Sequence, residues 1–150
     1  MEFNVINLAN LLIIAVIMIP NIIYALKGGE DAVSAAPIIT ILEQVGRYAS
    51  MALMILPLGV WKFGFTSVTA FLVYLFGNGA LLATYLLTWV FYFRKKSFAG
   101  TVILAIAPVL IFALTGVCLR HWLLVAAAVL FGICHLSISL QKPEEKSPRS

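Results

Sequence analysis

Five long, almost uncharged apolar stretches dominate this sequence and restrict what it can fold into. They cover residues 5–26, 38–61, 66–93, 99–119 and 122–140. A membrane-crossing helix needs about 20 mostly apolar residues, and each stretch is close to or above that length. Of the 150 residues, 63% are hydrophobic and 11% are charged, whereas soluble domains average about half and a quarter. A small domain cannot bury so much apolar surface, so the composition excludes a soluble, disordered or nucleic-acid-binding protein.

The predicted fold class is an all-α polytopic membrane protein, a bundle of five transmembrane helices. In the bilayer every backbone polar group must be satisfied within the segment or in a closed barrel. Barrel strands alternate apolar and polar residues, while stretches such as LLIIAVIMI and LLVAAAVLF are continuously apolar. We therefore expect residues 1–140 to form a single bundle. The polar tail, 141–150, is expected to be a disordered cytoplasmic end.

Positive charge predicts the orientation, because cytoplasmic loops of membrane proteins carry an excess of Lys and Arg. With five spans, Lys27, the cluster at 94–96 and three cations of the tail share one side, whereas Lys62 and Arg120 lie on the other. Seven cations against two predict an outside N-terminus, a cytoplasmic C-terminus and a multi-pass protein of the plasma membrane. A four-span reading would separate the cluster from the tail and remove this asymmetry.

Aromatic and polar residues mark the expected span ends. Trp61 and Trp122 are predicted at the outer interface, and Trp89 at the inner one with Tyr92. The step Arg120–His121 is expected to be a tight, solvated turn between two spans, because residues 99–140 as one helix would be roughly twice as long as the hydrocarbon core is thick. The sequence has no CxxC or HExxH spacing, so we predict no metal site and no cofactor.

The second stretch contains the strongest candidate for chemistry. Glu43 and Arg47 are four residues apart, on one helix face and in the favoured order for an ion pair. Ionisable groups at membrane depth are costly and tend to face a cavity or a partner. One interpretation is therefore a site for a ligand, a proton or a head group. The other is an internally neutral pair near the interface, with Arg47 extending its charge toward water.

The third stretch has a polar–aromatic stripe at helical spacing. It could line a binding cleft, or Asn78 could join helices while the aromatic rings fill the core. The stripe consists of Ser67, Phe71, Tyr74, Asn78, Tyr85, Trp89 and Tyr92.

Several polar residues should share one depth. Each lies about five to nine residues from the cytoplasmic end of its stretch, roughly 7–14 Å below the surface at 1.5 Å per residue. We expect them to converge on a polar pocket in the cytoplasmic leaflet. Helix-to-helix hydrogen bonding is the alternative role for Asn21. The set is Asn21, Glu43, Arg47, Tyr85, Thr88 and His135.

The segments ILEQVGRY, GVWKFGF and LRHWLLV, with the five-span layout, resemble small uncharacterised integral membrane proteins of Gram-positive anaerobic bacteria. That group carries no assigned activity, so the resemblance implies no site residue. Length and span number are also similar to those of the translocator protein family. The chain departs from that family because its three Trp do not form the Trp/Pro-rich signatures, and span number alone implies no porphyrin or sterol site.

Three functional hypotheses follow. The first is a membrane protein that binds, and by extension transports, a small polar or amphipathic ligand. Transport by so thin a bundle would need a homodimer or a larger membrane partner, and membrane lipids surround the chain in any case. The second is an accessory subunit of a larger membrane complex. The third is an intramembrane enzyme, for which we predict no catalytic residue. The candidate ligand-binding residues are Glu43, Arg47, His135, Tyr85, Asn21 and Asn78.

Overall fold

The computed structural model describes residues 4–28, 35–59 and 64–141 and contains five α-helices in these ranges. No strand occurs within them, which confirms the all-helical prediction for this part of the chain. Each helix is long and apolar enough to cross a membrane. The helices are α1 (Val5–Leu26), α2 (Pro37–Ile55), α3 (Val68–Arg94), α4 (Phe98–Cys118) and α5 (Trp122–Ser139).

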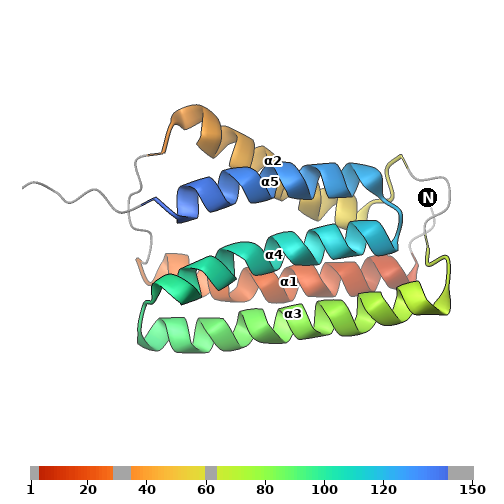
Figure 1. Cartoon of the computed structure of the whole chain (residues 1–150), viewed down its shortest axis with the longest axis horizontal. Coiled ribbons are helices and arrows are strands. Elements are labelled where there is room, and N and C mark those ends of the chain that lie inside the picture. The colour runs from red at the N-terminus through yellow and green to blue at the C-terminus, as the bar shows by residue number, and fades with distance from the viewer. Residues whose placement is uncertain (1–3, 29–34, 60–63, 142–150) are drawn as a thin grey trace, which may run out of the picture.

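Successive helices run in opposite directions, so that α1 begins at one end of the bundle and α5 ends at the other (Figure 1). The most extensive contacts join α2 to α5, α3 to α4 and α4 to α5. Half of the most apolar segment of α4 is buried, compared with 17% for α3. The helix α4 is therefore the most buried of the five and packs mainly between α3 and α5.

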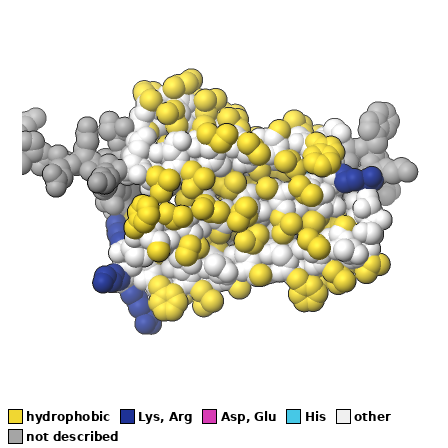
Figure 2. Space-filling view, in the orientation of Figure 1, with side chains coloured by type: hydrophobic (Ala, Val, Ile, Leu, Met, Phe, Trp, Pro, Cys, Tyr) yellow, Lys and Arg dark blue, Asp and Glu magenta, His cyan; other side chains and the backbone are white. Residues whose placement is uncertain are grey.

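The outer surface has the charge distribution of a membrane-spanning body. Figure 2 shows hydrophobic side chains over the middle of one face, and Lys and Arg only near its two ends. The ammonium of Lys27 lies 5.0 Å from the centre of the Phe93 ring, so the end of α1 and the end of α3 lie together. This architecture is that of a multi-pass membrane protein.

The end of α2 differs from the prediction. The helix stops at Ile55 rather than near residue 61. Leu56 is extended (φ −102°, ψ 122°), as is usual for a residue before proline, because the Pro57 ring disfavours helical geometry there. Trp61 and Lys62, predicted near this interface, lie outside the described residues. The other helices begin and end within two residues of the predicted limits.

The α4–α5 turn is where it was expected, but its histidine is not solvated. Arg120 adopts a positive φ of 53° and is exposed, whereas His121 is fully buried. The Leu124 N–H donates to Nδ1 of His121 at 3.4 Å, so the neutral ring carries its proton on Nε2, which faces the Leu56 carbonyl at 3.5 Å. Burial lowers the pKa of His121 from its usual value of 6.5, because the charged imidazolium would lose its hydration.

Buried asparagines hold α1 against its neighbours at the end of the bundle where α1 begins. Asn7 donates to the Ile55 carbonyl, and Asn10 donates to the Met54 carbonyl at 2.7 Å. The Tyr74 hydroxyl donates to Asn10 at 2.6 Å. These bonds join the start of α1 to the end of α2 and to α3.

The predicted stripe of α3 is mostly an inward face. Its buried members are Tyr74, Asn78, Tyr85 and Trp89, while Phe71 remains 42% exposed. Trp89 lies in an aromatic cluster, with its ring centre 5.3 Å from that of Tyr24, instead of facing the lipid. Trp122 is 64% exposed, and its place at a membrane interface stays a prediction.

Candidate functional site

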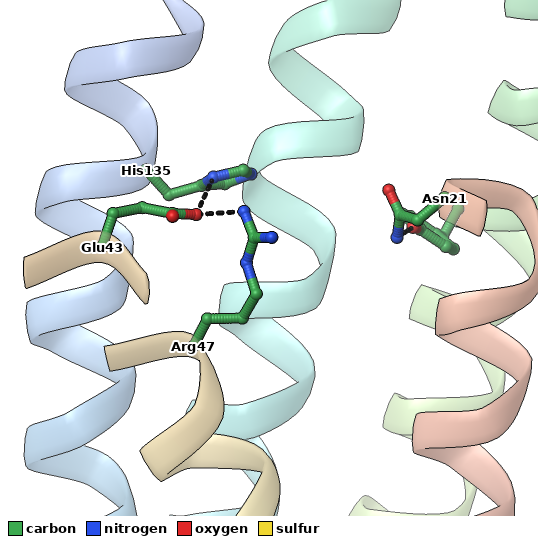
Figure 3. Close-up of polar contacts among 5 residues, drawn as sticks. Asn21, Glu43, Arg47 and His135 are labelled. Carbon is green, nitrogen blue, oxygen red and sulfur yellow. Dashed lines mark hydrogen bonds and ion pairs between the residues drawn. The ribbon is translucent and has the colours of Figure 1, made fainter. Parts of the chain in front are cut away.

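Glu43 is the centre of a charged cluster between α2 and α5. It is the one carboxylate side chain in the described ranges, and only 2% of the residue is exposed. Its Oε1 accepts a hydrogen bond from Nη2 of Arg47 and lies 2.9 Å from Nδ1 of His135 (Figure 3). A single buried carboxylate oxygen thus holds two basic side chains.

Local packing explains why these residues meet. Gly46 faces the backbone of Phe131 so closely that a Cβ atom would lie 2.8 Å from the Phe131 nitrogen. This contact brings α2 against α5 one turn away from Glu43. Phe131 also stacks on His135, with ring centres 4.8 Å apart. The guanidinium of Arg47 lies 5.8 Å from the centre of the same phenyl ring, a cation–π arrangement that aligns it.

A second polar group lies apart from this cluster, on α1 and α3. The side-chain amide of Asn21 donates to the Tyr85 hydroxyl at 2.7 Å and to the Ile17 carbonyl at 3.0 Å. Tyr85 in turn donates to the Ile17 carbonyl at 3.2 Å. These hydrogen bonds fix both side chains in place, and Asn21 lies apart from Glu43, Arg47 and His135 (Figure 3).

The two polar groups line one cavity of about 770 Å³. Ligand sites for small molecules have volumes of about 300–1,000 Å³, so the space has an appropriate size. All five helices contribute to it. Its apolar lining includes Ile17, Met18, Ile22, Met51, Leu104, Pro108, Phe112 and Phe131.

The most accessible polar group of the charged cluster is the Arg47 guanidinium, which is a hydrogen-bond donor. The Glu43 side chain is 3% exposed, whereas Arg47 is 31% and His135 is 21% exposed. A guanidinium has five N–H donors and no acceptor. Within the described residues, Arg47 has no carboxylate partner other than Glu43. The cavity therefore offers donor groups in front of a buried, neutralising carboxylate.

Five of the six predicted site residues line this cavity: Asn21, Glu43, Arg47, Tyr85 and His135. Their role in ligand binding stays a prediction. Asn78 does not line it. Its side-chain amide donates to the Thr115 hydroxyl at 3.0 Å and joins α3 to α4. Thr88, also expected in this layer, bonds to the Thr84 carbonyl of its own helix and lines no part of the cavity.

Sequence reasoning did not identify Gly46 and Phe131 as part of this site. Both carried a usable signal, because Gly46 follows Glu43 by three residues and Phe131 precedes His135 by four, each on the same helix face as its neighbour. Their contribution to the site depends on how α2 crosses α5, and residue spacing within one helix does not predict that crossing.

The chemistry available in the cluster is acid–base chemistry and ion pairing. No group of three or more His, Cys, Asp or Glu that could hold a metal ion occurs among the residues described. Glu43 and His135 lie within proton-transfer distance. In the same part of the chain, no hydroxyl or thiol is hydrogen-bonded to His135.

Comparison of the chain with protein-family models, with curated protein sequences and with solved structures gave no match.

Proposed function

We propose that this chain is a multi-pass protein of the plasma membrane that binds a small polar or amphipathic ligand in the cavity beside Arg47. The main support is the arrangement of Arg47 itself. Its guanidinium borders the cavity and is paired with Glu43. A preorganised donor in a partly apolar space is what a ligand carrying a carbonyl, carboxylate or phosphate requires.

The proposed orientation places the cavity in the cytoplasmic leaflet. Lys27 and Arg94 lie at the end of the bundle where α1 and α3 end, while Arg120 lies at the other end. An excess of positive charge favours the cytoplasm. Cysteines introduced at residue 4 and at residue 141 of a variant lacking the native cysteines test this orientation. A membrane-impermeant maleimide should label residue 4 but not residue 141 in intact cells, and the reverse pattern would contradict the orientation.

Native mass spectrometry of the protein purified from its own membrane tests ligand binding. We expect a bound species in the parent protein and its loss in Arg47→Gln, because the substitution removes the guanidinium and its hydrogen-bond donors. Arg120→Gln is the matched control, since that arginine is exposed at the opposite end. Equal occupancy in both variants would argue against the proposed site.

The alternative hypothesis of an accessory subunit has less support. It requires the polar stripe of the third span to face a partner, yet Tyr74, Asn78, Tyr85 and Trp89 are buried inside the bundle. The outward residues of α3 include Phe76, Leu87 and Phe91, each at least 60% exposed. Lipid chains can cover such an apolar surface, so it requires no protein partner.

A further inference from the structure

The polarity of the cavity changes along its length, and this gradient bears on the kind of ligand. At 1.5 Å per residue, Arg47 lies about 15 Å along α2 from Pro37, and Met51 lies about 21 Å along it. The deeper lining, toward the middle of the bundle, is apolar and comprises Ile17, Met51, Pro108 and Phe112. The lining near the end of the bundle is mixed: it includes Thr40, Gln44, Thr101 and Ser139 beside apolar residues such as Ala25 and Ile138.

This gradient has the same direction as that of a lipid leaflet. In a leaflet, polar head groups lie at the surface and hydrocarbon chains point toward the midplane. A ligand whose head lies at Arg47 and whose chain lies against Ile17 and Met51 therefore keeps the orientation of the surrounding lipids. It can move in from the membrane without turning over.

Three observations favour a sideways entrance to the cavity between α1 and α2. The described hydrogen bonds between these helices lie near the start of α1 and the end of α2, from Asn7 and Asn10. Figure 1 shows α2 inclined to the other helices, with its first turns farthest from α1. Cavity-lining residues on both helices are exposed, with Ile22 at 50% on α1 and Thr40 on α2.

Charge defines the head group. Glu43 and Arg47 are the only Asp, Glu, Lys or Arg side chains of the cavity lining within the described residues, and His135 and the phenols of Tyr24 and Tyr85 are the other titratable groups there. Glu43 is buried behind its two partners, so a cationic head group would face the Arg47 guanidinium and be repelled by it. A head group with hydrogen-bond acceptors would instead face the N–H donors of Arg47.

The geometry points to a single-chain amphiphile with a hydrogen-bond-accepting head group as the ligand, taken up sideways from the adjoining leaflet between α1 and α2. The head lies at Arg47, and the chain extends toward Ile17, Met51 and Phe112. This inference rests on the ligand-binding function proposed above and adds the ligand class and the route.

The test uses the full-length protein in lipid nanodiscs and three probes of equal chain length, each with a diazirine at the chain end. The probes carry a carboxylate, a methyl ester or a trimethylammonium head. We expect the carboxylate, the ester or both to label peptides containing Ile17, Met51 or Phe112, and the ammonium probe to label them at least about tenfold less, because it lacks an acceptor. The two accepting probes distinguish an ionised from a neutral carbonyl head. Equal labelling by the ammonium probe, or labelling confined to the outer face of α3, would overturn the inference.

Two pairs of variants separate the head site from the route. Arg47→Gln should reduce labelling by the accepting probe that labels the parent at least about tenfold, and Arg120→Gln should not. Ile22→Trp should slow the initial rate of labelling by narrowing the opening. Ile19→Trp is its control, since Ile19 is 55% exposed on the same helix but does not line the cavity. Equal rates in the two tryptophan variants would contradict the sideways route.

Failure of the ligand class and failure of the proposed function give different results. If acetate, which has no chain to bury, competes with the carboxylate probe as well as the unlabelled long-chain acid does, the cavity binds ligands but the amphiphile inference is wrong. If no probe labels in an Arg47-dependent manner and native mass spectrometry finds no bound species, the proposed function is itself wrong. A melting curve for each variant shows that lost labelling is not lost folding.

Discussion

The close crossing at Gly46 makes a quantitative prediction about what holds the charged cluster together. A Cβ atom at Gly46 would lie 2.8 Å and 2.9 Å from the nitrogen and Cα of Phe131. These are backbone atoms, so no side-chain rotation relieves the clash. For Gly46→Ala, α2 and α5 must separate by about 0.6 Å to reach ordinary contact at 3.4 Å.

Such overpacking in a well-packed interior costs about 1–3 kcal/mol. The melting temperature falls by about 2–4 °C per kcal/mol for a chain of this size, so Gly46→Ala should melt several degrees lower. The separation also stretches the bond between Glu43 and His135, which come from the two helices that move apart. Labelling by the accepting probe should therefore fall together with stability.

Gly79→Ala is the matched control, because a Cβ atom at Gly79 meets nothing within 4 Å. The substitution reduces backbone freedom in a helix and should be neutral or stabilising by up to about 1 kcal/mol. The assay is thermal unfolding of both variants in the same detergent, followed by circular dichroism. Equal melting temperatures for the Gly46 and Gly79 variants would refute the reasoning that this crossing depends on a missing side chain.

Three further changes test other parts of the structure. Glu43→Gln leaves the Arg47 charge without its carboxylate and should destabilise the protein by about 1–3 kcal/mol. The double variant with Arg47→Gln should recover part of this loss in thermal melts, and no recovery would count against the pairing. The lowered pKa of His121 means that the unfolded chain binds more protons than the folded one just below pH 6.5, so stability should decline as the pH falls through about 6.5. His121→Gln should flatten this part of the melting-temperature profile, and an unchanged slope would exclude His121 as its source. Asn10→Ala removes two interhelical hydrogen bonds and should cost about 1 kcal/mol, whereas Thr84→Ala, whose hydroxyl bonds only within its own helix, should have no measurable effect in the same melts.

Composition and spacing alone determined the five-helix architecture and most helix limits. Long apolar runs must become helices in lipid because no other single segment satisfies its own backbone. The same reasoning could place Glu43, Arg47 and His135 at one depth, since depth depends only on counting residues from a span end.

Tertiary structure decided which residues of that depth meet. Thr88 shares the layer but bonds within α3, and Asn78 joins α3 to α4 away from the cavity. His121, read as a solvated turn residue, is buried. Rotation and tilt depend on packing between helices, such as Gly46 against Phe131. Contacts of that kind arise between segments far apart in the chain, so the residue pattern within any one stretch does not predict them.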